Sequence, residues 1–235
     1  MKHKYLIAVF FFISTLSATA QTPGGVDKPM VWSHDSASFR VSAGAGLTYI
    51  GVSKVYGEKE QAIWSLGSGK AITCMQTTER AANLGNGTFM NYAKDSLPEM
   101  RLYSYTTSSN MGNGQTLHIG RNGNTQLPVK NLDGRTVEYT VFDRRLSDAE
   151  RCRVESYLAL KYDVSLRSSY LNSRSEVIWN GYTNKAYSHR IAGIISDKAS
   201  ALHKTRAKSC EEDGFLTIRM SKPLEDGESL LWGDN

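Results

Sequence analysis

The chain has 235 residues, of which 22% are charged, with 28 Lys and Arg against 23 Asp and Glu and a formal net charge of +5. This balance is too mild for a nucleic-acid binder, which usually carries a concentrated basic patch, so no nucleic-acid partner is expected. A chain of this length can bury one large β-sandwich core, or one core and a small second unit.

The first twenty residues have the three parts of a secretory signal peptide. Lys2 and Lys4 supply a positive start, an apolar run follows at 5–16, and small residues at 18–20 supply a cleavage site. The apolar run is too short for a membrane span. Cleavage after residue 20 would start the mature chain near Gln21, and no membrane span is expected in it. The protein is therefore predicted to be exported, as a secreted or cell-surface protein.

Short strand-forming runs, separated by Asn-Gly and Asp-Gly pairs, predict an antiparallel β-sandwich or jelly roll. These pairs tolerate the positive φ angles that tight hairpins require. In the run 135–142, Val137, Tyr139 and Val141 alternate with polar residues, which gives one apolar face. A parallel α/β fold is disfavoured because no helices separate these runs. The other predicted strands before residue 146 lie at 47–52, 61–66, 99–105 and 116–120.

The stretch LSDAERCRVESYLALKYDVSL, residues 146–166, predicts one α-helix at 147–162 in this otherwise β-rich chain. Ser147 followed by Glu150 is a capping box, which is typical of a helix start. Asp163 stands where Gly commonly ends such a helix, and Asp can also adopt the left-handed conformation. We expect the helix to pack one side on the sandwich and to expose the other to water, because apolar residues at three- and four-residue spacing form one stripe: Val154, Tyr157, Leu158 and Tyr162.

Strand-like runs return after the helix at 176–179, 190–195, 215–220 and 229–232. They predict three parts: a signal peptide at 1–20, a sandwich at 21–166 and a small β-rich unit at 167–235. The last three residues form a turn-like tripeptide, so this unit is expected to be truncated and to precede further domains. The basic cluster at 203–208 has no interleaved aromatic residues and is interpreted as a solvated loop or helix face.

Three cysteines, Cys74, Cys152 and Cys210, are too few for a scaffold held together by disulfides. One pair could form and leave one free thiol, and the sequence leaves all three pairings open. There is no CxxC motif and the histidines are scattered, so a zinc site is not expected.

Three segments before residue 163 share motifs with a known family. Residues 117–121 read LHIGR, residues 133–147 read DGRTVEYTVFDRRLS, and residues 157–162 read YLALKY. This series resembles the closing section of a laminin G-like, concanavalin A-like domain, in which an IGR strand and an acidic strand precede a helix that begins LSxxE. Val137 and Asp163 depart from the usual Ile and Gly of that pattern.

The trailing unit is similar to a bacterial subgroup of such proteins. Its motifs are VIWN at 177–180, IAGI at 191–194, DKASAL at 197–202 and LLWGDN at 230–235. Together with ESYLALKY in the helix, they resemble repeats of large secreted or surface-attached adhesin-like proteins. The resemblance implies a lectin-type β-sandwich with a recognition or adhesion role and a glycan or protein ligand outside the cell.

We therefore expect a non-enzymatic surface recognition module. The alternative is a jelly roll that binds or degrades polysaccharide. Degradation needs two carboxylates that flank the glycosidic bond. Glu138 and Asp143 lie five residues apart, on opposite faces of a strand, and no ExDxxE motif occurs. Glu138 matches the acid of the laminin G-like strand and is interpreted as a solvent-facing or cross-strand pairing residue.

Carbohydrate binding would require exposed aromatic rings with polar groups beside them. Tyr103 and Tyr105 share one strand face and are the candidate ligand-binding residues, with Arg101 beside them. Trp64 and Trp179 lie within apolar runs and are predicted to belong to the core.

No cofactor is expected, with calcium as an open alternative because related sandwiches often hold it at a rim of loops. Loop residues with oxygen-bearing side chains are the candidate ligands. These are Asp95, Asn110, Asn122 and Asp133.

Overall fold

The computed structural model describes residues 21–56, 61–67, 73–76, 88–90, 100–123, 129–208 and 216–234. Over these residues the chain is mainly β, with antiparallel sheets and a single α-helix, α1 (Asp148–Tyr162), which confirms the predicted fold class. The predicted signal peptide lies outside the described residues. No helix in the described part of the chain is both long and apolar enough to cross a membrane.

Two antiparallel sheets build the sandwich, and they use every strand predicted before the helix. The first sheet contains, in spatial order, β1 (Val31–Ser33), β10 (Gly134–Phe142), β3 (Leu47–Val55), β7 (Met100–Thr107) and β6 (Thr88–Met90). The second sheet contains β2 (Ser38–Ser42), β8 (Asn113–Ile119), β4 (Gln61–Leu66) and β5 (Thr73–Gln76), and β9 (Lys130–Asn131) pairs with β4 in parallel.

Strand β3 contributes to two cores, one on each face of the first sheet. Tyr49 faces the second sheet and packs near Trp64, with ring centroids 5.9 Å apart. Ile50 and Val52 face the other way and join a cluster with α1. Successive side chains of a strand point to opposite faces, so a strand covered on both sides must be apolar almost throughout. The sequence LTYIGVSKV meets this requirement in part, since it is mostly apolar but also buries the hydroxyls of Thr48 and Ser53.

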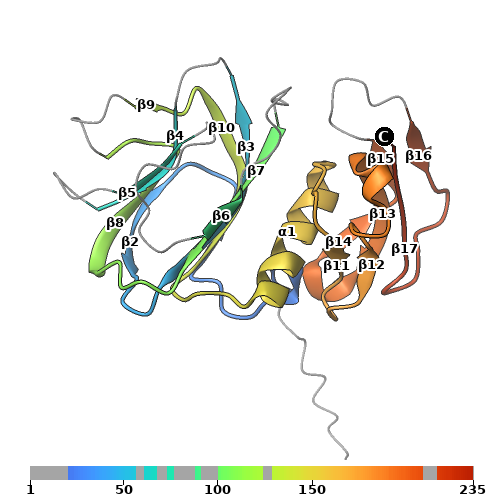
Figure 1. Cartoon of the computed structure of the whole chain (residues 1–235), viewed down its shortest axis with the longest axis horizontal. Helices are drawn as coiled ribbons and strands as arrows, with labels where there is room; N and C mark the ends of the chain where they lie inside the picture. The colour runs from blue at the N-terminus through green and yellow to red at the C-terminus, as the bar shows by residue number, and fades with distance from the viewer. Residues whose placement is uncertain are drawn as a thin grey trace, which may run out of the picture.

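The trailing unit packs on the side of α1 that faces away from the sandwich (Figure 1). Its main sheet, the third sheet, has β13 (His189–Asp197) between β14 (Leu202–Lys204) and β17 (Ser229–Asp234). Two strand pairs flank it, β11 (Tyr170–Leu171) with β12 (Val177–Trp179), and β15 (Arg206–Lys208) with β16 (Thr217–Arg219). The 3-10 helices are η1 (Pro23–Gly25), η2 (Lys185–Tyr187) and η3 (Lys198–Ser200).

The basic cluster at 203–208 is not the predicted loop or helix face, because it contributes to β14 and β15. Lys204 donates hydrogen bonds from its ammonium group to the carbonyl oxygen of Leu160 and to the carboxylate of Asp163. This cation therefore joins the trailing unit to the C-terminal end of α1, where the helix dipole favours positive charge.

Both ends of α1 form as the sequence predicts. The hydroxyl of Ser147 accepts a hydrogen bond from the backbone N–H of Glu150, and the Glu150 carboxylate accepts one from the backbone N–H of Ser147, at 2.9 Å. Asp163 ends the helix in the left-handed conformation, with φ 57°, and its N–H bonds to the carbonyl oxygen of Ala159. Local sequence therefore determines where this helix begins and ends.

The expectation that α1 exposes one side to water is wrong for the middle of the helix. Every residue from Val154 to Leu160 is buried, because the first sheet covers one side and the trailing unit covers the other. The two polar residues in this stretch have partners. Glu155 accepts a hydrogen bond from Arg151 at 2.8 Å, and the hydroxyl of Ser156 donates to the carbonyl oxygen of Cys152 at 2.7 Å. The helix is thus an inner layer between two β units.

Candidate functional site

The predicted aromatic ligand site does not lie on the surface. Tyr103 and Tyr105 are 1% and 0% exposed, and Arg101 is also buried. Both rings point from β7 toward the second sheet, where Tyr105 lies 5.2 Å from Trp64 between ring centroids. Burial raises the pKa of Tyr103 to about 12, with Arg101 acting in the opposite direction. The structure corrects this prediction, because a strand face covered by a second sheet cannot present rings to a glycan.

The predicted calcium ligands are not brought together in the described part of the chain. Asn110 precedes β8 and Asn122 follows it, on the order of 20 Å apart along a strand of this length. The side-chain oxygen of Asn110 already accepts a hydrogen bond from the backbone N–H of Gly112. Asp133 lies beyond β9, on the same side as Asn122, and Asp95 lies outside the described residues.

The predictions for tryptophan and cysteine residues have mixed outcomes. Trp64 is fully buried, which confirms its assignment to the core, and Trp179 packs against the helix core while half-buried. Cys74 and Cys152 are free thiols, so these two do not pair in this structure. Cys210 lies outside the described residues.

Glu138 is a fully buried charged side chain with several polar partners. One carboxylate oxygen accepts hydrogen bonds from Trp32 Nε1 at 2.7 Å and from the Tyr157 hydroxyl at 2.8 Å. The other oxygen accepts a hydrogen bond from the Tyr162 hydroxyl at 2.5 Å. It also lies 2.6 Å from Lys161 Nζ and 3.2 Å from His34 Nε2. We refer to these residues as the Glu138 cluster.

The electrostatics of the Glu138 cluster favour an ionised carboxylate. Burial by itself would raise the pKa of Glu138, but hydrogen bonds from Lys161, Tyr162 and Trp32 outweigh it and hold the pKa below its usual value. Burial and the nearby carboxylate raise the pKa of Tyr157. The ionised carboxylate therefore acts as a hydrogen-bond acceptor for its neighbours. With its acceptor positions occupied, it is poorly suited to act as a general base.

The Glu138 cluster joins β10, β1 and α1, so the interpretation of Glu138 as solvent-facing is wrong. Sequence reasoning had noticed the acid and the tyrosines separately, within the family motifs. Spacing relates only part of this set, because Tyr157 and Lys161 lie four residues apart on one helix face while Tyr162 is adjacent to Lys161. That all three reach Glu138 follows from the packing of α1 on the first sheet.

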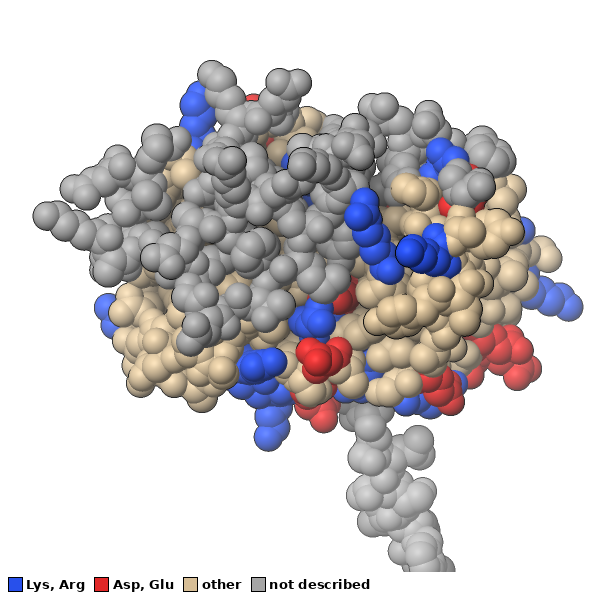
Figure 2. Space-filling model, in the orientation of Figure 1, with Lys and Arg blue, Asp and Glu red and all other residues tan. Residues whose placement is uncertain are grey.

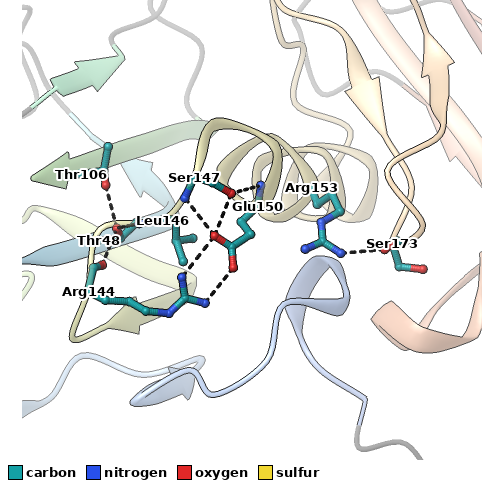
Figure 3. Close-up of polar contacts among 8 residues, drawn as sticks. All are labelled: Thr48, Thr106, Arg144, Leu146, Ser147, Glu150, Arg153 and Ser173. Atoms are coloured by element: carbon teal, nitrogen blue, oxygen red, sulfur yellow. Dashed lines mark hydrogen bonds and ion pairs between the residues drawn. The ribbon is translucent and has the colours of Figure 1, made fainter.

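The start of α1 is attached to both β units, as Figure 3 shows. On the sandwich side, the hydroxyl of Thr48 accepts a hydrogen bond from the Leu146 N–H at 3.0 Å and shares another with Thr106. On the trailing side, Arg153 donates to the carbonyl oxygen of Ser173 at 2.7 Å. These contacts fix how the trailing unit sits against the sandwich.

A different part of the trailing unit exposes aromatic side chains. Residues 180–187, which we name the tyrosine turn, carry Tyr182 at 89% and Tyr187 at 54% exposure. Hydrogen bonds hold the backbone of this turn. The side-chain oxygen of Asn180 accepts hydrogen bonds from the N–H groups of Tyr182 and Thr183, at 3.0 and 3.1 Å. The N–H of Gly181 donates to the Ser169 hydroxyl at 3.0 Å.

Alternation within apolar runs does not reveal this turn. The sequence signal for it is the Asn-Gly pair at Asn180, followed by two tyrosines. Turns favour exposed side chains, so an aromatic residue inside a turn motif is a better surface candidate than one inside a strand.

Charged groups on the viewed face of the molecule are scattered. Figure 2 shows Lys and Arg of the described residues as separate groups, with Asp and Glu between them. The described residues visible on this face do not form a continuous basic surface of the kind that binds duplex nucleic acid.

Comparison with known proteins gives one family match. Residues 150–235 match the model of a domain of unknown function, DUF8202. The matched segment starts within α1 and includes the trailing unit, so the helix and the third sheet fall into one segment similar to this family. No curated protein and no solved structure matches the chain.

Proposed function

We propose that this protein is an exported, non-enzymatic recognition module that acts at the bacterial surface and contacts its ligand through the tyrosine turn. The observation that carries this proposal is the 89% exposure of Tyr182 on a turn whose backbone is fixed by Asn180. The export signal and the resemblance to adhesin-like repeats support the surface location.

Exposed tyrosines on a braced turn suit molecular contact for a physical reason. Tyrosine supplies a large flat surface and loses little conformational entropy on binding, and such residues often dominate binding energy at interfaces. A backbone that is ordered before binding avoids the cost of ordering it on contact. The largely exposed Tyr182 side chain contributes little to the packing of the fold, and this favours a role in contact with a ligand.

The rest of the molecule would hold this turn in a fixed position. The sandwich, α1 and the third sheet share one core cluster, which includes Ile50, Leu158 and Ile195. A turn attached to such a core projects in a constant direction from the sandwich. This arrangement favours display of a contact surface.

A binding screen of the full chain, recovered after export from a bacterial host, tests the proposal. Labelled protein is applied to a glycan array and to immobilised extracellular proteins, with and without calcium. We expect saturable binding that weakens about tenfold or more in Tyr182→Ala. Tyr56→Ala, which removes an exposed tyrosine at the end of β3, is the matched control and should bind normally.

Three results would contradict the proposal. Absence of saturable binding on either surface, in either calcium condition, would remove the recognition role. Steady release of reducing ends from a bound polysaccharide would establish the degrading alternative in its place. Binding that Tyr182→Ala leaves intact would place the contact surface elsewhere on the molecule.

A further inference from the structure

The chemistry around the tyrosine turn narrows the class of ligand. We propose that this turn, together with Arg167, binds an acidic glycan whose sugars carry carboxylate or sulfate groups. This inference rests on the proposed function and specifies the ligand for the same site. It is carried by three features of the described residues: the local charge, the packing that brings Arg167 to the turn, and the mixture of groups on the surface.

The charge around the turn is positive. No Asp or Glu occurs between Val177 and Arg190. Arg190 is neutralised by Asp234, which accepts hydrogen bonds from its Nε at 2.7 and 2.8 Å. Lys185 and Arg167 are both exposed, and neither has an ion pair within the described ranges. Two cations therefore remain available to an anionic ligand at this surface.

Packing places Arg167 beside the turn although it lies thirteen residues before Asn180. The backbone of Gly181 presses against the neighbouring segment, since an added Cβ would lie 2.7 Å from the carbonyl carbon of Ser168. The Gly181 N–H also donates to the hydroxyl of Ser169. Arg167 directly precedes this contact and is exposed, so its backbone lies close to the turn, and we assign its side chain to the edge of the same surface.

Tyr182 and Lys185 are both exposed and lie three residues apart within the turn. The N–H of Asn184 bonds to the carbonyl oxygen of Asn180, and the N–H of Tyr187 bonds to that of Asn184, so the segment is two consecutive turns that meet at Asn184. An exposed ring and an exposed ammonium group thus lie within one short segment, with the hydroxyl of Thr183 between them along the chain.

This mixture fits an acidic sugar better than the other anionic partners. A tyrosine ring offers an apolar face to the C–H face of a sugar, and amide and hydroxyl groups match its hydroxyls. Arg and Lys bind carboxylate or sulfate through charge-assisted hydrogen bonds. A protein partner would need about 800 Å² of contact on each side, whereas a polysaccharide repeats a small ring-plus-charge unit.

Calorimetric titration of the full chain with polygalacturonate tests the proposal. Titration with the methyl ester of the same polymer shows the role of the carboxylate charge, because the sugar backbone is unchanged. Heparin supplies sulfate groups as a second acidic glycan. Polyglutamate and phosphatidylglycerol vesicles supply negative charge without sugar rings. We expect binding to at least one acidic glycan and at least tenfold weaker binding to the methyl ester. The interaction should also weaken as salt is raised, because the cations are exposed.

Variants separate the ring from the charge. Tyr182→Ala should weaken acidic-glycan binding about tenfold, and Lys185→Gln and Arg167→Gln about fivefold each. Tyr182→Phe keeps the ring and should bind normally. Lys198→Gln on η3 removes an exposed cation outside this surface and is the charge control.

Each other outcome overturns the inference in a recognisable way. Equal binding to the methyl ester, or binding only to neutral glycans or proteins through Tyr182, would remove the acidic ligand and leave the proposed function standing. Equal binding to polyglutamate or to vesicles would show that charge alone is recognised. Acidic-glycan binding unchanged in Tyr182→Ala would place the site elsewhere. Absence of every ligand, on the array and in solution, would remove both proposals.

Discussion

At the scale of single residues, Glu138 shows how a buried charge can hold two elements together. Its carboxylate joins Trp32 from β1 to Tyr157, Lys161 and Tyr162 from α1. Burying a carboxylate is costly unless its acceptor positions are filled, and here donors approach both oxygens. The same arrangement makes removal of the charge damaging, because the donors would remain buried without their acceptor.

Replacement of Glu138 by Gln should therefore destabilise the protein by about 3–5 kcal/mol, the usual loss when one partner of a buried pair is removed. The amide has one acceptor oxygen in place of two and would place an N–H₂ group against Lys161 or Tyr162. Urea unfolding at neutral pH measures the loss. Glu176→Gln, which alters an exposed carboxylate paired with Arg174, should leave the midpoint unchanged. A loss in Glu138→Gln as small as that of an exposed pair would contradict the structural role.

At the scale of elements, the N-terminal end of α1 depends on one carboxylate with several partners. Glu150 accepts hydrogen bonds from Arg144 at 2.9 and 3.2 Å and from Ser147. The Arg144 guanidinium is the main cause that lowers the pKa of Glu150 to about 2, with further contributions from Ser147. Arg144 also lies above the ring of Phe142, so the ion pair is attached to the end of β10.

This shift predicts how the contribution of Glu150 depends on pH. A carboxylate whose pKa is lower in the folded state stabilises the fold above its unfolded value of about 4.5, and that stabilisation is lost as the pH falls toward 2. The stability difference between the wild type and Glu150→Gln should therefore shrink between pH 4.5 and pH 2. Thermal unfolding at a series of pH values measures it.

The pKa of Glu155, on the same helix, is shifted in the opposite direction to that of Glu150. Burial raises the pKa of Glu155, although Arg151 acts against it, so its ionised form is disfavoured in the folded state. The stability of the wild type relative to Glu155→Gln should accordingly fall as the pH rises above about 4.5, the reverse of the trend for Glu150. Parallel trends in the two variants would mean that the helix responds to overall charge and not to these particular contacts.

At the scale of the whole molecule, α1 connects the sandwich to the trailing unit through one core. The cluster around the helix includes Val52 and Leu102 from the first sheet and Ile191 and Leu202 from the third sheet. Gly193 shows how closely the third sheet approaches, since an added Cβ there would lie 3.1 Å from Leu160 and 2.8 Å from Leu231. Two β units that share a core in this way are expected to unfold together.

The variant Leu160→Ala tests this coupling. Truncation of a buried leucine should cost about 2–5 kcal/mol, and the shared core should pass the loss to both units. Hydrogen exchange of amides in β3 and in β13 measures the two units separately within one protein. We expect both sets of amides to lose protection by the same free energy. Loss of protection confined to β13 would show that the trailing unit unfolds independently of the sandwich.

Much of the local structure could be predicted from the sequence. The capping box at Ser147 and Glu150 and the left-handed Asp163 depend on interactions between residues near one another in the chain, and the strand runs at 47–52 and 135–142 are recognisable from their local composition and alternation. Such patterns carry their own physical cause, so they were interpreted correctly without knowledge of the fold. The antiparallel class followed from the same turns and runs.

Tertiary structure alone decided which faces are covered. Alternation along β7 showed that Tyr103 and Tyr105 share a face, but it could not show that a second sheet lies over it. The apolar stripe of α1 identified one packed side, while the burial of Ser156 on the other side required the trailing unit, where the backbone N–H of Leu171 donates to its hydroxyl. Glu138 found its partners on a helix and a strand distant in sequence, and packing alone brought the backbone of Ser168 against Gly181 of the tyrosine turn. Burial and side-chain partnership are properties of the assembled layers, because they depend on which surfaces meet and not on the order of residues within either one.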